Sequence, residues 1–298
     1  MPEILPVQID AKATPIVTVA MPIYNAGKHL RQAVMSIVKQ TFTGWELFII
    51  DDGSTDNAIE SIVDIQDTRI HILCDGKNKG LAARLNEAID LAHGQYLARM
   101  DQDDVSYPDR LLRQVTALQG NRRLDLVATR AITIDENNNI TGIFPYRLSH
   151  NEICARPWSG FYFPHPTWMG RIEWFRKYRY AEPAPYFCED QELLLRSYRT
   201  SCFATLNEIL FAYRIRGKAN REKLARTFRA VINIQVHYFL RSGQWHYLLL
   251  ALLVFMGRIA NNWLTLALCD ASKNSTIIEP AVLLQWNSIS NRLGDGAR

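Results

Sequence analysis

The chain has 298 residues, of which 48% are apolar and 21% are charged, and its formal net charge at pH 7 is +4. This composition is typical of an enzyme-sized globular protein and excludes a low-complexity or fibrous chain. The five cysteines are scattered and form no Cys-x-x-Cys pair, which argues against zinc or redox chemistry and favours a reducing compartment. The first fifteen residues lack an apolar core, so we expect a short arm there and not a secretory signal.

The first part of the sequence alternates apolar strands with amphipathic helices. Strands are predicted at residues 16–21, 45–50, 70–73 and 95–99, and helices at 27–40, 57–65 and 81–92. This alternation predicts a parallel sheet covered by helices on both faces. Ligands of such sheets bind where the strands end.

Acidic residues follow two of these strands. Asp51 and Asp52 end the strand WELFII, and QYLAR runs into Asp101, Asp103 and Asp104. Because Asp101 and Asp103 are two positions apart at a strand end, we expect their side chains to point to one side. Carboxylates gathered at one sheet edge need a divalent cation or hydrogen-bond donors from a ligand. Taken alone, the second cluster is equally consistent with an acidic turn before the next helix.

The pattern changes from about residue 124. Shorter strands follow, with a hairpin-like Asn run in AITIDENNNITGIF, the aromatic stretch WSGFYFPHPTWM and a strand at 208–213. The chain is then predicted to be helical from 218 to about 269. The apolar run at 247–256 spans about 15 Å as a helix, roughly half of a bilayer's hydrocarbon core, so it is too short to cross a membrane.

Six segments occur in an order typical of one enzyme family. They are VTVAMPIYNAG with QAVMSIVKQTF, WELFIIDDGSTD, NKGLAARLNEAI, YLARMDQDD with PDRL, HPTWM and CEDQELLLR. On these segments the sequence resembles the family 2 glycosyltransferases of GT-A fold, over about residues 15–216. The resemblance implies an α/β, Rossmann-like and mostly parallel sheet flanked by helices, here with a helical C-terminal extension.

The resemblance also implies a nucleotide pocket. Pro22, Tyr24 and Asn25 would lie at this pocket, with the Tyr24 ring packed on the base. Asp52 matches the carboxylate that hydrogen-bonds the base, which is usually uracil in this family. We expect Arg84 to face the nucleotide edge, although a surface position on its helix would look the same.

The metal and the catalytic base follow from the same resemblance. Asp101 matches the first acid of the Asp-x-Asp motif, and Asp103 matches the aspartate that binds Mn²⁺ or Mg²⁺. A hard divalent cation would neutralise the departing nucleoside diphosphate. Asp190 matches the base of inverting transfer, with Glu189 alongside, although Asp190 alone would also suit a helix cap.

Three further residues have two interpretations each. His165 could contact the donor phosphate or the acceptor, or it could be a structural hydrogen-bonding group. Arg214 and Arg216 could bind diphosphate oxygens, but a solvated basic turn fits the sequence somewhat better.

The expected reaction is an inverting, metal-dependent transfer of one sugar, of hexosyltransferase type. The donor would be a nucleotide-diphosphate sugar, by resemblance a UDP-sugar, and the acceptor a glycan or lipid-linked molecule in cell-surface polysaccharide synthesis. The region after CEDQELLLR lacks the Gln-x-x-Arg-Trp segment of polymerising members, so processive synthesis is not expected.

Two other functions fit the sequence less well. A sugar-phosphate nucleotidyltransferase would normally have a Gly-rich, basic loop after the first strand, where MPIYNAGK has one Gly and one Lys. A non-catalytic, membrane-docked assembly subunit would have lost an acid of the site, whereas Asp101, Asp103 and Asp190 are all present.

We expect a catalytic domain over 1–217, with a nucleotide-binding half at about 15–123 and an acceptor half at about 124–217. A helical region over 218–298 follows. The basic stretch 214–229 and the aromatic residues Tyr238, Phe239, Trp245 and Tyr247 predict peripheral contact with the cytoplasmic face of a membrane. The apolar run would suit packing on the domain or on a second subunit equally well. No nucleic-acid partner is expected.

Overall fold

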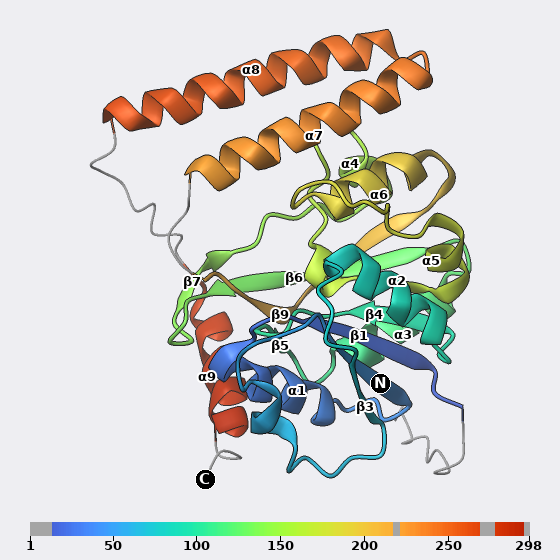
Figure 1. Cartoon of the computed structure of the whole chain (residues 1–298), viewed down its shortest axis with the longest axis vertical. Helices are drawn as coiled ribbons and strands as arrows, with labels where there is room; N and C mark the ends of the chain where they lie inside the picture. The colour runs from blue at the N-terminus through green and yellow to red at the C-terminus, as the bar shows by residue number, and fades with distance from the viewer. Residues whose placement is uncertain (1–13, 217–220, 269–277, 295–298) are drawn as a thin grey trace.

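The computed structural model describes residues 14–216, 221–268 and 278–294, which form an α/β fold around a nine-stranded sheet (Figure 1). The strand order is β3-β2-β1-β4-β8-β6-β9-β5, and β7 pairs with β6. The strands are β1 (Val17–Ile23), β2 (Trp45–Asp51), β3 (Ile70–Cys74), β4 (Tyr96–Arg99), β5 (Val105–Ser106), β6 (Leu126–Ile134), β7 (Ile140–Ile143), β8 (Met169–Arg171) and β9 (Phe203–Arg214).

Strands β3, β2, β1 and β4 are parallel, as the alternation of strands and helices predicts. Every residue of β1 and β2 is buried, because helices cover both faces of the sheet. Helices α1 (Leu30–Val38) and α3 (Arg110–Gly120) pack with one set of alternate strand residues. Helix α2 (Leu81–Leu91) packs with the other set, together with α5 (Ile172–Tyr178) and α6 (Glu189–Ser197).

The helix predicted at 57–65 is reduced to the short 3-10 helix η2 (Ile59–Ile62). The segment contains four β-branched residues, at 59, 62, 63 and 65, and such residues lose side-chain freedom in a helix. The remaining helices of the first half lie within a few residues of their predicted bounds.

The second half of the sheet is mixed. Strand β6 pairs in parallel with β9 but antiparallel with β8 and β7, and β5 pairs antiparallel with β9. The predicted Asn-rich hairpin is confirmed as β6 and β7, and Asn138 in its turn adopts a positive φ of 66°. The expected α/β class is therefore confirmed, although antiparallel pairs are more frequent in this half than the sequence suggests.

Two of the C-terminal helices form a hairpin on one side of the sheet (Figure 1). Helix α7 (Arg221–Arg241) contacts α6, and α8 (Trp245–Leu268) packs on α7 as the outermost layer. Among the described residues, no helix combines the length and the apolar character needed to cross a bilayer.

Helix α9 (Pro280–Gly294) lies apart from this hairpin, beside α1 and the end of the sheet (Figure 1). Its Trp286 is 2% exposed, stacks on Tyr107 and donates from Nε1 to the backbone oxygen of Asn138 at 2.8 Å. Ile289 and Leu293 complete a core shared with β5, β6 and β9. The last helix therefore stabilises the strands that the catalytic domain is expected to contain.

Replacing Trp286 with alanine should lower the free energy of unfolding by about 3 kcal/mol, the usual cost of truncating a packed tryptophan. Denaturant titration measures the change. Leu284→Ala on the same helix is the matched control, because Leu284 is 71% exposed and its truncation should cost almost nothing. Equal effects in the two variants would show that α9 is not packed as described.

Candidate active site

The loops after β1, β2 and β4 meet at the carboxyl end of the sheet. The backbone N–H of Tyr24 donates to Oε1 of Gln102 at 2.6 Å, and Nε2 of Gln102 donates to the Tyr24 carbonyl at 3.0 Å. The amide oxygen of Asn25 accepts from the backbone N–H of Thr55 at 2.8 Å, and the Asn25 N–H donates to Oγ of Ser54 at 3.0 Å. The three segments that the sequence assigns to a donor site therefore form one hydrogen-bonded unit.

The predicted base-stacking residue is open to a ligand. Tyr24 is 49% exposed, whereas Pro22 is buried in β1, where it pairs with Ile50. Asn25 adopts a positive φ of 48°, and its side chain is held by the neighbouring loop. This arrangement leaves the aromatic face of Tyr24 accessible above a fixed backbone. The stacking role itself stays a prediction.

Asp52 and Arg84 form a buried ion pair, with Nε of Arg84 2.9 Å from Oδ1 of Asp52. Asp52 also accepts from the backbone N–H groups of Lys79 and Gly80 just before α2. Arg84 is 1% exposed and pairs with Asp75 as well, so the alternative of a surface helix position is wrong. The pair supports the loop beside Asp51 and Asp52. Contact between Asp52 and the nucleobase of a donor stays a prediction.

Each acid of the Asp-x-Asp motif is paired with an arginine. Oδ1 of Asp101 lies 2.5 Å from Nη2 of Arg99, and Oδ2 of Asp103 lies 2.5 Å from Nε of Arg216. Burial and the nearby charge of Asp101 raise the pKa of Asp103, which the arginine partner opposes. Arg216 also donates to the carbonyl of Ala26, in the loop that follows Tyr24. Arg216 therefore connects Asp103, the predicted metal ligand, to the loop that is predicted to bind the nucleotide.

The interpretation as a solvated basic turn is wrong for Arg214, whereas Arg216 is exposed but paired with Asp103. Arg214 is 3% exposed and donates to the carbonyls of Asp103 and Asp135. Its backbone N–H donates at 2.7 Å to Asp104, whose side chain is fully buried. Arg214 ends the long strand β9 and Arg216 follows it, so this strand carries both arginines to the acidic cluster. Asp104 is thus a structural residue that holds this strand end.

The central cavity, of about 570 Å³, opens beside this cluster. The acids Asp101, Glu189 and Asp190 line it together with Arg99 and His165. Its aromatic wall consists of Phe144, Phe161, Tyr162, Phe163, Phe187 and Tyr213. The cavity therefore joins the first acid of the Asp-x-Asp motif to the predicted base region, which are about ninety positions apart in the sequence.

The two acids at the start of α6 have perturbed titration. Burial, followed by the charge of Asp190, raises the pKa of Glu189 to about 7. Burial also raises the pKa of Asp190, whose Oδ2 accepts from Nε2 of Gln191 at 3.1 Å. A carboxylate with a pKa near the working pH is suited to accept a proton from a hydroxyl. The geometry leaves both acids available as the base.

His165 is a buried member of the cavity wall. Its Nε2 lies 2.8 Å from the hydroxyl of Tyr180, and its Nδ1 lies 3.8 Å from Oε1 of Glu189. Burial and the charge of Arg99 hold the pKa of His165 well below its usual value, so the ring is neutral. Its hydrogen bond to Tyr180 supports the structural interpretation, while its place in the cavity keeps contact with a substrate possible.

The donor set suits a divalent cation that also binds phosphate. Across the described ranges, no three His, Cys, Asp or Glu side chains gather into a metal site. However, Mg²⁺ is commonly held by one or two carboxylates and completed by substrate phosphates and water. Asp101 and Asp103 can provide such carboxylates, although Arg216 currently occupies one oxygen of Asp103.

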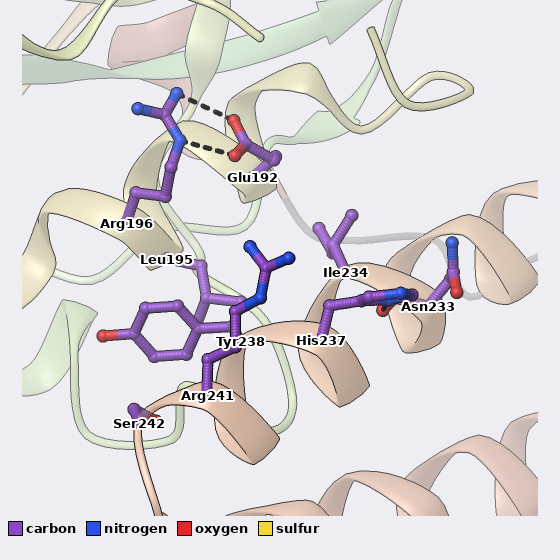
Figure 2. Close-up of a pocket in the computed structure, with 9 residues that line it drawn as sticks. All are labelled: Glu192, Leu195, Arg196, Asn233, Ile234, His237, Tyr238, Arg241 and Ser242. Atoms are coloured by element: carbon purple, nitrogen blue, oxygen red, sulfur yellow. Dashed lines mark hydrogen bonds and ion pairs between the residues drawn. The ribbon is translucent and has the colours of Figure 1, made fainter. Parts of the chain in front are cut away.

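A second cavity, of about 360 Å³, lies between α6 and α7 (Figure 2). Leu195, Ile234 and Tyr238 provide apolar walls, and Arg241 and His237 lie at the same cavity. The Glu192 carboxylate here is neutralised by Arg196 at 2.5 Å (Figure 2). This cavity contains none of the acids at the end of the sheet, so the central cavity is the better candidate for chemistry.

Arg99 and Tyr180 were not predicted from the sequence. Arg99 is the last residue of β4, and its position two residues before Asp101 is the signal for their ion pair. No local pattern marks Tyr180, because its partner His165 belongs to a separate segment.

The family model described as glycosyl transferase family 2 matches residues 18–179, more than half of the chain. The protein therefore belongs to this family. An uncharacterised glycosyltransferase of Methanocaldococcus jannaschii is 30% identical over 212 residues, covering 69% of this chain and 73% of that protein. The Escherichia coli UDP-Glc:alpha-D-GlcNAc-diphosphoundecaprenol beta-1,3-glucosyltransferase WfgD is 31% identical over 140 residues, covering 46% of this chain and 54% of the enzyme.

Solved structures share the fold at low sequence identity. S. aureus TarS 1-349 in complex with UDP gives a TM-score of 0.60 at 16% identity, covering 93% of this chain and 79% of that chain. The mannosyltransferase PcManGT from Pyrobaculum calidifontis, in complex with GDP-Man and Mn²⁺, gives 0.57 at 14% identity, covering 96% and 83%. These likenesses confirm the fold alone.

The stability that Glu189→Gln adds to the unchanged chain should be larger at pH 8 than at pH 5. Because the folded pKa of Glu189 is raised from 4.5 to about 7, stability falls as the pH rises through this interval, and glutamine removes the effect. We expect a gain of about 1–3 kcal/mol at pH 8, measured by thermal or denaturant unfolding. Glu60→Gln, at an exposed position of η2, is the control. A loss of stability at pH 8 would contradict the assignment.

Proposed function

We propose that the protein transfers a single sugar, with inversion, from a nucleotide-diphosphate sugar to a glycan or lipid-linked acceptor in cell-surface polysaccharide synthesis. One observation carries the proposal: the central cavity joins Asp101, beside the donor loops, to the buried acids Glu189 and Asp190. Family membership supports glycosyl transfer, and the name of the Escherichia coli relative supports a UDP-sugar donor.

In this proposal the donor lies along the joined loops. The base stacks on the exposed ring of Tyr24, and Asp52 accepts a hydrogen bond from it, supported by Arg84. Asn25 fixes the loop between them. The base is thereby held at the edge of the sheet, and the diphosphate extends toward Asp103.

Asp103, with Asp101, would hold Mn²⁺ or Mg²⁺ at the diphosphate. The cation, when bound, neutralises charge that grows on the leaving diphosphate. Oδ2 of Asp103 can take part only if it is shared with or released by Arg216. A released Arg216 guanidinium has the charge and planar shape to bind phosphate oxygens beside the cation.

Asp190 acts as the base at the acceptor side of the cavity, with Glu189 as the alternative. As the acceptor oxygen bonds to the anomeric carbon, its proton passes to the carboxylate. The bond from that carbon to the diphosphate oxygen breaks, and its electron pair leaves with the diphosphate. Attack opposite the leaving group inverts the anomeric configuration.

The expected division into a catalytic domain over 1–217, with halves at about 15–123 and 124–217, and a helical region over 218–298 is part of this proposal. So is a location at the cytoplasmic face of the membrane. A panel of nucleotide sugars in thermal-shift measurements, with and without Mn²⁺, tests the donor class, because ligand binding to the folded state raises the midpoint. Stabilisation by none of the UDP-sugars would reject that donor.

Asp190→Asn should slow sugar transfer at least about 100-fold while leaving donor binding nearly unchanged, because only the proton acceptor is lost. Turnover assays and donor titrations measure the two effects. Glu189→Gln is the paired variant, and a larger loss there would identify Glu189 as the base. Normal turnover in both variants would remove the two acids from the mechanism.

Asp103→Asn should weaken Mn²⁺-dependent binding of UDP by at least about tenfold, since even changes around metal ligands cost that much. Calorimetric titration of UDP with and without Mn²⁺ measures the loss. Asp64→Asn is a matched control, because it breaks an exposed Asp–Arg pair with Arg31 far from the acidic cluster in sequence. If Asp103→Asn behaved like this control, Asp103 would not be a metal ligand.

A further inference from the structure

Helix α8 presents an uncovered apolar stripe to solvent. Trp245, Leu249, Leu252, Leu253 and Met256 are between 39% and 64% exposed, and their spacing places them on one side of the helix. The opposite side is packed: Ala251 is fully buried, and Arg258 lies over the ring of Phe228 on α7. In Figure 1, α8 is the outermost layer, so nothing within the described residues covers this stripe.

The stripe differs from the membrane contact expected from sequence. Phe239 is fully buried, and the rings of Tyr238 and Tyr247 pack against it. These aromatic residues join α7 to α8 and to the domain, because a helical hairpin has to fill the space between its own helices. Of the four aromatic residues expected at an interface, Trp245 alone belongs to the exposed stripe.

The hairpin that carries the stripe has mostly positive charges. Between Trp245 and Leu268 the sequence contains no Asp or Glu, and its one Lys or Arg residue, Arg258, donates inward to the carbonyl of Ser159 at 2.7 Å. The adjoining α7 has five Lys and Arg residues against the single acid Glu222, a net charge of +4. Its side chains at 223, 226, 229 and 241 are exposed.

The hairpin is attached to the segment that forms the cavity wall. Nε2 of Gln235 donates to the carbonyl of Pro157 at 3.0 Å, and Trp158 packs on Tyr247 with ring centroids 4.8 Å apart. The same segment continues into Phe161 and Tyr162, which line the central cavity. Lys223, in the first turn of α7, lines it too. A surface held by α8 would thus lie close to the acceptor side of the cavity.

We propose that the exposed stripe of α8 docks on an anionic lipid surface, toward which the net positive charge of α7 attracts the hairpin. An interfacial helix of this kind buries its apolar side at the level of the headgroups and gains affinity from nearby basic residues. The docked enzyme would have its cavity next to lipid-linked acceptors. This last step rests on the proposed function, whereas the docking does not.

Charge decides between a bilayer and a second copy of the chain. Pairing two α8 stripes would bring two α7 helices, each with a net charge of +4, toward each other, and like charges repel. An anionic surface attracts the same charges. A flat surface can also contact the whole length of a helix that lies outermost (Figure 1).

The test is flotation of the full chain with vesicles of phosphatidylglycerol and phosphatidylcholine, and with vesicles of phosphatidylcholine alone. The variant Leu249→Glu/Leu253→Glu puts two charges into the stripe. Val63→Glu/Leu284→Glu is the matched control, because these residues are 62% and 71% exposed on other elements. The melting temperature and UDP binding of each variant show whether it folds and retains the donor site.

The full chain and the control should float with anionic vesicles, and the stripe variant should bind at least about tenfold more weakly, corresponding to a loss of 1.4 kcal/mol. Failure of the full chain to float, equal binding to neutral vesicles, or an undiminished stripe variant would overturn the proposal. So would a dimer in light scattering that the stripe variant abolishes. Because flotation needs no donor, failure of UDP binding alone would count against the proposed function and not against docking.

Discussion

Carboxylates gathered at the carboxyl end of the sheet impose a charge requirement that arginines meet. Asp52 is paired with Arg84, Asp101 with Arg99 and Asp103 with Arg216. Leaving a buried charge without its partner costs about 3–5 kcal/mol. Three separate parts of the chain therefore supply the cations that compensate these acids.

These ion pairs connect segments that are far apart in the sequence. Arg99 ends β4, Arg84 lies on α2, and Arg216 follows β9, more than a hundred residues after its partner. The Arg216 pair differs from the Asp52–Arg84 pair because Asp103 is a proposed metal ligand, so a bound cation would compete with the arginine for this carboxylate. A donor diphosphate with a divalent cation brings both charges that such an exchange needs. Folding stability and ligand binding are thus linked through one ion pair.

Much of the fold follows from local patterns. The continuous apolar runs of β1 and β2 predict strands buried on both faces, and the order of strands and helices predicts their parallel pairing. The two-residue spacing of Asp101 and Asp103 predicts a shared side, but both residues lie in the turn after β4, where the strand period does not apply. The helix predicted at 57–65 is largely absent, because its β-branched residues disfavour a helix.

Contacts between distant segments were not predictable in the same way. Arg214 and Arg216 look like surface residues, because nothing nearby in the sequence shows that β9 ends at the acidic cluster. Arg84 has the spacing of an ordinary helix residue, and its burial depends on Asp52 and Asp75. The stripe on α8 becomes visible only when the structure shows which apolar residues of the C-terminal helices are already covered.

The central claim is that the joined loops and Asp103 form a donor site with a metal. Anomalous diffraction at the manganese edge, from crystals grown with UDP and Mn²⁺, tests it most directly. The account predicts one manganese peak bonded to the Asp103 carboxylate and to the diphosphate, with uracil on the Tyr24 ring and Arg216 shifted from its present partner. UDP bound elsewhere, such as between α6 and α7, or manganese away from Asp103 would contradict it.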